Sequence, residues 1–230
     1  GGGPLTAAAS VILNVASVND APSINAPASI NLNEDGSTNI ALSVADVDAT
    51  DLKVTLQVAH GSFTLGSSAG LTFLNDIATA KTFTGTLADL NAALASITYQ
   101  PDAHFNGADA LSILVDDQGQ TGAGGALTAA NSVVLNVAAI NDAPTINAPT
   151  SVNLNEDSST NIALSVADVD ATNLKVTLQV AHGSFNLGSV LGLTFITNNA
   201  NSKTFTGSIA DINAALNAIT YNPDANYNGA

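Results

Sequence analysis

The sequence contains no cysteine, methionine, tryptophan or arginine, and only four lysines. Without cysteine the chain has no disulfide, no thiolate-bound zinc and no cysteine nucleophile. The four basic residues stand against 19 acidic ones, and the formal net charge is −15. Nucleic acids and anionic membrane surfaces are bound through Lys and Arg, so we expect no nucleic-acid partner. No apolar run approaches the roughly 18 residues typical of a membrane span, so we expect no membrane insertion in this segment.

The sequence also contains an internal repeat. The tetrapeptide Asn-Asp-Ala-Pro at residues 19–22 recurs at 141–144, an offset of 122 residues. Residues 19–108 align with residues 141–230 without a gap, and about three quarters of the positions are identical. An offset of this length is typical of an array of domains rather than of a solenoid of short repeats.

The repeat divides the chain into three parts. Residues 1–18 match residues 123–140 and are predicted to be the last strand of a preceding repeat. Residues 19–140 are predicted to form one complete domain, and residues 141–230 a second repeat that lacks its final strands. A unit of this length is long enough to bury its own core.

Short runs of alternating apolar residues predict an all-β chain. In Leu52–Val58, for example, Lys53, Thr55 and Gln57 should face the solvent. The other expected strands are Val11–Val15, Ser29–Asn33, Ile40–Val44, Phe63–Leu65, Leu71–Phe73, Thr82–Thr84, Thr98–Gln100, Leu111–Val115 and Val133–Val137. The fold expected is an antiparallel β-sandwich in each repeat.

One segment of each repeat has helical rather than strand spacing. In Leu87–Ile97 the apolar residues recur every three or four positions, and Thr86 followed by Asp89 resembles a capping pair. We therefore expect one short helical insertion per repeat, which covers the core.

If loops alternate between the two ends of such a sandwich, most acidic residues gather at those ends. One end should carry Asn19, Asp20, Asp46, Asp48, Asp116 and Asp117. The opposite end should carry Glu34 and Asp102, facing Asn141, Asp142, Asp168 and Asp170 of the next repeat. Glu156 and Asp224 would take the places of Glu34 and Asp102 for a following unit.

Acidic clusters with so few bases need another source of positive charge. Two carboxylates about 4 Å apart repel by about 1 kcal/mol in water and by more at a protein surface. Calcium binds 6–8 oxygen ligands from carboxylates, Asn side chains and backbone carbonyls. We therefore expect Ca²⁺ at these positions. The alternative is a solvated acidic surface that only keeps the chain soluble.

These residues lie in a recognisable series of motifs. Leu-Asn-Glu-Asp-Gly-Ser-Thr begins at residue 32, Val-Ala-Asp-Val-Asp-Ala at 44, Pro-Asp-Ala at 101, and Val-Asp-Asp-Gln-Gly at 115. Asn-Val-Ala, two residues further and then Asn-Asp-Ala-Pro close the repeat from residue 136. In this order the motifs resemble those of cadherins. The whole unit more closely resembles the cadherin-like, Ig-like tandem repeats of giant bacterial surface adhesins, including RTX and biofilm-associated ones.

The resemblance implies a function for the segment. It implies a calcium-stiffened extender of a long extracellular adhesin, on a bacterial surface or in a biofilm matrix, whose partners are the neighbouring repeats. It also implies that the acidic and Asn residues named above are the calcium ligands. Two departures are the absence of a second acid after Asp102 and the absence of glycine-rich nonapeptide calcium repeats.

Other functions are less well supported by the residues. His60 and Ser62 share a turn, but no third catalytic member accompanies them, so we expect no enzyme. A glycan-binding module would need exposed aromatic residues, and aromatics make up only 4% of the chain. A self-assembling fibre subunit, in which residues 1–18 of one molecule complete the open second repeat of another, remains the alternative.

Overall fold

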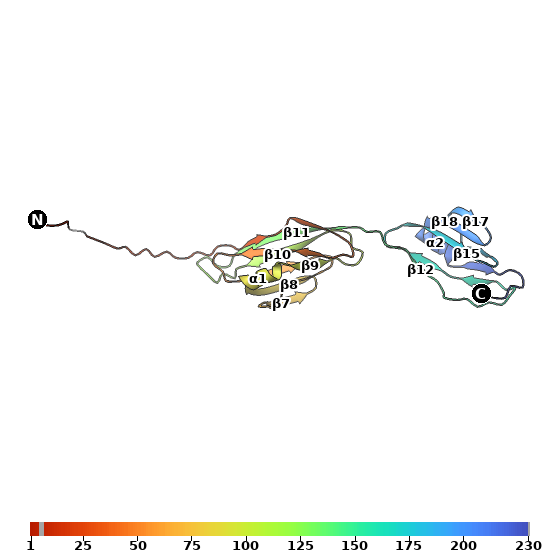
Figure 1. The fold of residues 1–230 in the computed structure, drawn as a ribbon, viewed down its shortest axis with the longest axis horizontal. Coiled ribbons are helices and arrows are strands. Elements are labelled where there is room, and N and C mark those ends of the chain that lie inside the picture. The colour runs from red at the N-terminus through yellow and green to blue at the C-terminus, as the bar shows by residue number, and fades with distance from the viewer. Residues whose placement is uncertain (5–6, 230) are drawn as a thin grey trace. The chain divides into compact units, whose positions relative to one another are not determined.

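In the computed structural model, which describes residues 1–4 and 7–229, the chain forms two compact units (Figure 1). Unit 1 comprises residues 1–140 and unit 2 residues 141–230, and each is described by itself. Both consist mainly of short β-strands with one short helix each. The expected all-β, sandwich-like fold is confirmed.

Unit 1 consists, in its described part, of eleven strands and one helix. In chain order these are β1 (Ser23–Asn25), β2 (Ser29–Asn33), β3 (Thr38–Ile40), β4 (Ser43–Ala45), β5 (Asp51–Gln57), β6 (Ser62–Thr64), β7 (Thr72–Ile77), β8 (Ala80–Thr86), α1 (Leu87–Leu94), β9 (Ile97–Gln100), β10 (Gly107–Asp116) and β11 (Thr128–Ala138).

The strands of unit 1 form one large sheet and two smaller ones. The large sheet has the order β2-β11-β10-β5-β8-β7, and the smaller sheets are β3-β9-β6 and β1-β4. All named strand pairs are antiparallel except β2 and β11, which run parallel. Residues from both the large sheet and the smaller ones meet in one continuous apolar core. The parallel pair brings the end of β11 to the same end of the unit as the end of β2.

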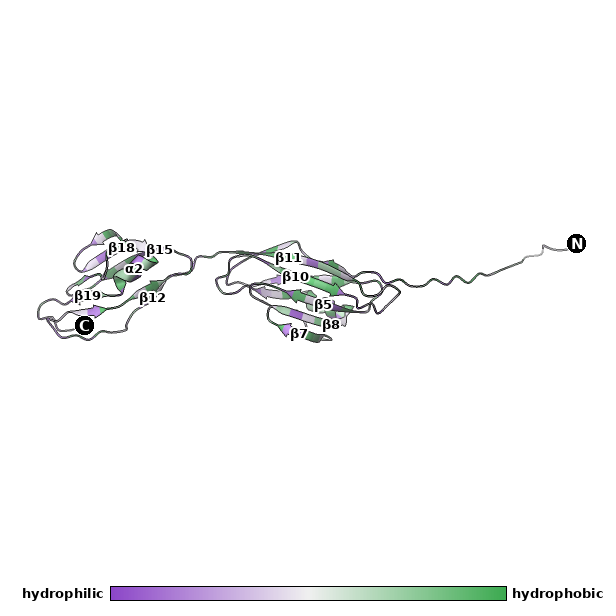
Figure 2. Ribbon diagram, turned by 180° about the vertical axis from the view of Figure 1, so that it is seen from behind, coloured by the Kyte–Doolittle hydropathy of each residue, from purple (hydrophilic) through white to green (hydrophobic). Residues whose placement is uncertain are grey.

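The alternation along β5 explains its place in the middle of the large sheet. Leu52, Val54 and Leu56 are completely buried, while Lys53 and Thr55 on the other face remain partly accessible. Strands β7 and β8 also carry both hydrophobic and hydrophilic residues (Figure 2), but in β7 Phe73 and Leu74 precede Asn75 and Asp76, so this edge strand does not alternate as β5 does. The predicted outward positions of Lys53, Thr55 and Gln57 are confirmed.

Helix α1 begins where its capping pair predicts. The Thr86 side-chain oxygen accepts the N–H of Asp89 at 3.2 Å, and Leu90 and Leu94 are buried against the core. The predicted end at Ile97 is wrong, because Ile97 pairs with Ile40 as the first residue of β9. The hydrogen bonds and burial gained in a sheet outweigh the helical spacing of that residue.

Two predicted strands are also corrected. Ile40–Val44 is not one strand, since it is divided between β3 and β4, where the Leu42 N–H turns aside to bond the Leu94 carbonyl at 3.0 Å. Val11–Val15 forms no strand, and Val11, Leu13 and Val15 are 82–92% exposed. Residues 5 and 6 of the predicted first segment lie outside the described residues. A strand without a neighbour cannot pair its backbone groups, and the sequence alternation alone does not replace that neighbour.

Unit 2 repeats the first part of unit 1. Its elements are β12 (Thr145–Asn147), β13 (Thr160–Ile162), β14 (Ser165–Ala167), β15 (Asn173–Gln179), β16 (Ser184–Asn186), β17 (Thr194–Asn198), β18 (Ser202–Ser208), α2 (Ile209–Leu216) and β19 (Ile219–Asn222). They form the sheets β12-β14, β13-β19-β16 and β15-β18-β17.

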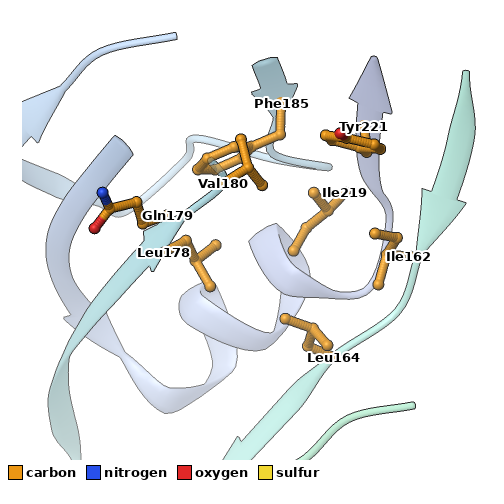
Figure 3. Close-up of a pocket in the computed structure, with 8 residues that line it drawn as sticks. All are labelled: Ile162, Leu164, Leu178, Gln179, Val180, Phe185, Ile219 and Tyr221. Atoms are coloured by element: carbon orange, nitrogen blue, oxygen red, sulfur yellow. The ribbon is translucent and has the colours of Figure 1, made fainter. Parts of the chain in front are cut away.

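Residues 141–229 contain no counterparts of β10 and β11, and the interior of unit 2 is therefore open on one side. A groove of about 140 Å³ runs over apolar residues there, including Leu164, Leu178, Phe185 and Tyr221 (Figure 3). The corresponding residues of unit 1 are at most 3% exposed. Strands β10 and β11 therefore decide whether this core is closed.

Candidate metal centre

The predicted polar residues at the first end of unit 1 are brought together. This end, here called the entry end, is formed by the chain before β1, the β4–β5 loop and the β10–β11 loop. The Asn19 amide nitrogen donates to an Asp117 carboxylate oxygen at 2.6 Å, and the Asp20 N–H donates to Asp48 at 2.8 Å. The three segments, distant in sequence, are therefore joined through acidic side chains.

Asp46 organises the β4–β5 loop. Its Oδ1 accepts the N–H groups of Asp48 at 2.8 Å and of Ala49 at 2.7 Å, which closes a turn around the carboxylate. Its other oxygen, Oδ2, is also inaccessible to solvent but has no hydrogen-bond partner among the described residues. One oxygen of this carboxylate thus accepts two hydrogen bonds, and the other accepts none from the described residues.

Asn19 shows the same imbalance. The residue is only 5% exposed, and its Nδ2 donates to Asp117 and to the Gly125 carbonyl, at 2.9 Å for the latter. Its Oδ1 is buried and, within the described part of the chain, has no hydrogen-bond partner. A buried oxygen left without a donor costs about 1–3 kcal/mol. Carboxylate and amide oxygens are ligands that a hard divalent cation prefers, so Asn19 and Asp46 are residues that could hold such an ion.

Asp117 is the most deeply buried acid of unit 1, with 0% exposure. Burial alone would raise its pKa, but the N–H groups of Leu127 and Gly119, both 2.8 Å away, together with the Asn19 amide, outweigh burial and lower the pKa below its usual range. This carboxylate is therefore charged at neutral pH although no lysine contacts it among the described residues.

The neighbouring Asp116 is stabilised in another way. Its Oδ2 forms an ion pair with the Lys53 ammonium group at 2.6 Å, and this contact is the main reason that the pKa of Asp116 is lowered. Since Lys53 occupies one carboxylate oxygen and the Gln118 N–H the other, Asp116 is less suited than Asp46 to bind an ion.

The opposite end of unit 1, here called the exit end, contains a second buried acid. Glu34 is 3% exposed, and its two oxygens accept the Ile140 N–H at 2.6 Å and the Asn106 amide at 3.2 Å. Both of its oxygens are thus held in place by the last residue of unit 1 and by the loop before β10.

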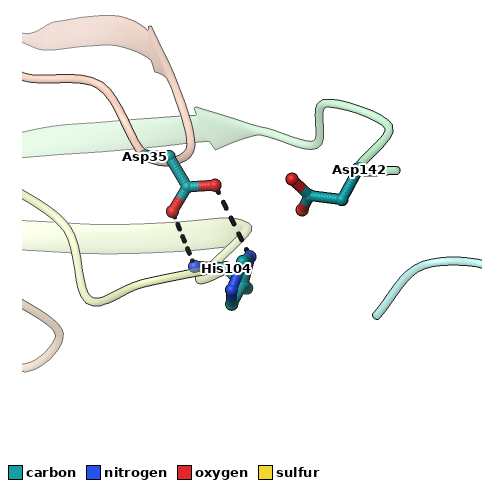
Figure 4. A group of neighbouring side chains, drawn as sticks. All are labelled: Asp35, His104 and Asp142. Atoms are coloured by element: carbon teal, nitrogen blue, oxygen red, sulfur yellow. Dashed lines mark hydrogen bonds and ion pairs between the residues drawn. The ribbon is translucent and has the colours of Figure 1, made fainter. Parts of the chain in front are cut away.

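Asp102 lies at this end as predicted but takes no part in the contacts of Glu34. Its side chain is exposed and, among the described residues, forms no hydrogen bond or ion pair. Asp35, which the sequence analysis did not single out, instead accepts the His104 N–H at 3.0 Å and lies 3.5 Å from its Nδ1 (Figure 4). Asp35 and His104 both have positive φ angles, so the local backbone is specialised to bring them together.

Unit 2 reproduces the acidic turn but not the burial. The Asp142 N–H donates to Asp170 at 2.6 Å, and the N–H groups of Asp170 and Ala171 donate to Asp168, as at the equivalent positions of unit 1. Asn141, however, is exposed, because residues 141–229 have no counterpart of the loop that covers Asn19.

The second exit end is also open, because residues 141–229 contain no counterpart of Ile140 or of the end of β11. Glu156 is exposed where Glu34 is buried, and Asp224 lies 3.9 Å from the His182 imidazole. The sequence therefore identifies equivalent acids correctly, but their surroundings differ between the two units.

The number of charged ligands within one unit is small. Taken alone, neither unit brings three Asp, Glu or His ligand atoms within 4.8 Å of one another among the described residues. An ion bound at one end of one unit must therefore also use Asn and backbone oxygens, or ligands from beyond that unit.

Several residues of these ends were not predicted from the sequence. Gly125 and Leu127 contribute only backbone groups, and no side-chain pattern marks them. Lys53 was expected only to face outward, and its pairing with Asp116 follows from the register of β5 and β10, in which the two residues are opposite each other.

Comparison with known proteins does not identify a family. No family model matches the chain, and a search of curated proteins found no significant match. Neither of the two described helices is long and apolar enough to span a bilayer.

The two lowered pKa values predict how acid affects unit 1. A carboxyl group whose pKa is lowered by folding stabilises the folded state above its ordinary value near 3.8, and this stabilisation is lost as the pH falls. We expect the free energy of unfolding of unit 1 to be steady from pH 7 to about 5 and to fall below about pH 4. Urea denaturation at each pH, followed by hydrogen-exchange mass spectrometry, measures the two units separately.

The variant Asp117→Asn should lower the stability at pH 7 by roughly 1–3 kcal/mol, and its deficit relative to wild type should shrink as the pH falls. Asp51→Asn is the matched control, because it removes the same charge at a position where the second repeat itself has Asn173. A deficit of Asp117→Asn that stays constant down to pH 2 would show that the charge of Asp117 is not what stabilises the unit.

Proposed function

We propose that this chain is a segment of a calcium-stiffened spacer, made of tandem β-sandwich repeats that hold other parts of a long extracellular bacterial adhesin or surface fibre away from the cell. The observation that carries the proposal is a set of three buried side-chain oxygens at the entry end of unit 1 that have no hydrogen-bond partner among the described residues, Asn19 Oδ1, Asp46 Oδ2 and Thr121 Oγ1. Acidic residues that served solubility alone would keep all their oxygens in water.

The repetition of the acidic turn supports a role in the array rather than in one unit. Asp46 and Asp168 occupy the same turn and accept the same two backbone N–H groups. The turn therefore occurs near the beginning of both repeats. A site that is present in both repeats favours a structural role in each repeat. A single catalytic or ligand-binding site would need only one copy.

The exit end contacts the chain directly before Asn141 and Asp142. Glu34 accepts the N–H of Ile140, and the next residues along the chain are Asn141 and Asp142. We propose that a calcium ion binds Glu34, Asn141 and Asp142 together with Asp168 and Asp170, and that Asn19, Asp20, Asp46 and Asp48 form the same kind of site one repeat earlier. Calcium would supply the positive charge that the four lysines cannot, and would fix the linker.

The calcium affinity expected of these sites is typical of extracellular proteins. A single site at ten times its dissociation constant stabilises the bound state by only about 1.4 kcal/mol. Several sites must therefore act together to stiffen a linker. Sites of millimolar affinity are filled by the calcium levels outside cells. The chain also lacks cysteine, so an extracellular array of these repeats needs a stiffening device other than disulfides.

The first prediction concerns calcium binding itself. Isothermal titration calorimetry with Ca²⁺ should detect binding to the 230-residue chain, and Asp46→Asn should weaken or remove one class of site, by at least about tenfold in affinity. Asp51→Asn should titrate like wild type, since the second repeat has Asn at that position. Equal titrations of wild type and Asp46→Asn would exclude the partnerless Asp46 oxygen as a ligand.

The second prediction concerns stiffness. X-ray scattering of the 230-residue chain in millimolar calcium should fit a single conformation with a defined maximum dimension, and chelator should broaden the distribution of distances, because the acidic linker loses its cross-links. Asp168→Asn in calcium should resemble wild type in chelator. Scattering profiles that are the same with and without calcium would contradict the spacer proposal even if calcium binds.

A self-assembling fibre subunit is the second candidate, and one observation favours it. Val11, Leu13 and Val15 are 82–92% exposed, whereas their counterparts in β11, Val133, Leu135 and Val137, are at most 5% exposed. Unit 2 has an apolar groove where unit 1 has β10 and β11. The first segment of one molecule has the sequence to fill the place of β11 in another molecule by strand addition. It reproduces β11 only, and the place of β10 stays empty, so the spacer is our first candidate.

Strand addition predicts self-association that depends on one face of the first segment. Light scattering after size-exclusion chromatography should show oligomers whose fraction rises with concentration, and Leu13→Asp should abolish them. Ile12→Asp is the matched control, because its counterpart Val134 is 42% exposed in unit 1 and the outer face should tolerate a charge. A chain that stays monomeric at all concentrations, or two variants that behave alike, would contradict strand addition.

A further inference from the structure

The loop between β10 and β11 of unit 1, residues 117–127, is long and rich in glycine, and the sequence analysis assigned no role to it beyond Asp117. Asp117 holds the base of the loop closed, because its backbone N–H bonds the Leu127 carbonyl at 3.1 Å and its carboxylate accepts the Leu127 N–H. Gly122, Gly124 and Gly125 all have positive φ angles. The loop thus has a fixed base and an unusual backbone path above it.

The tip of this loop pairs with the segment that enters the unit, Ser17–Asp20, here called the entry linker. The Ala123 N–H donates to the Ser17 carbonyl at 3.1 Å, and the Asn19 N–H donates to the Ala123 carbonyl at 3.0 Å. Val18 and Ala123 form a parallel β-bridge. The Asn19 side chain adds the bonds to Gly125 and Asp117 already described. The loop therefore holds one residue on each side of Val18 by its backbone.

The glycine at the point of contact is required by the close approach. A Cβ atom on Gly122 would lie 2.6 Å from the backbone nitrogen of Asn19, and Gly122 has a φ of 76°. Both the crowding and the φ angle exclude an ordinary side chain at this position. Gly125, by contrast, has nothing within 4 Å of the position of such an atom. Gly122 is thus shaped to receive the linker backbone.

The pairing begins where the exposed first segment ends. Residues 7–16 form no strand and are exposed, whereas Asn19, three residues further, is 5% exposed. Residues 141–229 include no such loop, and the equivalent Asn141 is exposed there. The loop, and not the sequence of the linker, is therefore what immobilises this Asn.

We propose that loop 117–127 is a clasp that binds the entry linker of its own repeat, independently of calcium. Its ligand is this entry linker, recognised by two backbone hydrogen bonds and by the Asn19 side chain. The Asn19 amide can donate both to Asp117 and to the Gly125 carbonyl and still present its oxygen to a cation. The clasp adds to the spacer proposal, on which it rests. Loop 117–127 would hold the entry linker without calcium, and the ion would stiffen the same linker further.

The chemistry of Asn19 separates the clasp from the calcium site. Asn19→Ala removes the two side-chain donors and leaves the backbone pairing. Asn19→Asp has the size of Asn but cannot donate, and it places a second carboxylate against the buried Asp117. The clasp therefore predicts that both variants loosen the linker and that Asp is the worse of the two when no cation is present.

The test is hydrogen exchange of individual amides, measured by NMR spectroscopy of the whole 230-residue chain in chelator. The Asn19 and Ala123 amides should be protected in wild type, and Asn19→Ala should speed their exchange by at least about tenfold. Asn19→Asp should speed it further in chelator. Asn141→Ala is the matched control and should leave both amides unchanged, because Asn141 is exposed.

The outcomes distinguish the clasp from the spacer proposal. Unprotected Asn19 and Ala123 amides in chelator, or exchange that Asn19→Ala does not change, would overturn the clasp. Amides that become protected only after calcium is added would overturn it too, since the contact would then depend on the ion. Protected amides in a chain that fails to bind calcium would support the clasp and contradict the calcium-stiffened spacer.

Discussion

The bond between the Asn19 amide and the fully buried Asp117 carboxylate is the contact on which the entry end of unit 1 depends. Asp117 is charged without a basic partner, so it is stable only while backbone N–H groups and Asn19 surround it. Those same donors come from the β10–β11 loop and from the linker. Satisfying one buried charge therefore closes the loop and binds the linker, and it leaves the Asn19 oxygen without a donor among the described residues.

The two units show how strongly this arrangement depends on the last two strands. Asn19 and Asn141 occupy equivalent positions in nearly identical local sequences, and so do Glu34 and Glu156. In each pair the first is buried and the second exposed. The difference arises because β10, β11 and their connecting loop cover both ends of unit 1. The acidic turn around Asp46, which is local, is by contrast the same in both units.

A prediction from sequence succeeds here wherever the determining contacts are close along the chain. The alternation of β5 and the cap at Thr86 need only a few consecutive residues. It fails where two local patterns compete or where the partner is distant. Ile97 satisfies helical spacing yet pairs with Ile40, and Val11–Val15 alternates like β11 yet finds no neighbour within unit 1.

By itself the sequence determined the repeat, the fold class and the placement of the acids along the chain. It has a unit repeated after 122 residues, an all-β architecture, and acids placed at the ends of strands with few bases to neutralise them. Only the tertiary structure decided which of these acids are buried and which oxygens have no donor. Asn19 and Glu34 bond backbone groups 106 residues away in sequence, the Gly125 carbonyl and the Ile140 N–H, and Asp117 bonds the Asn19 side chain 98 residues away. A backbone N–H leaves no trace in the identity of its residue, so the fold alone shows where it points.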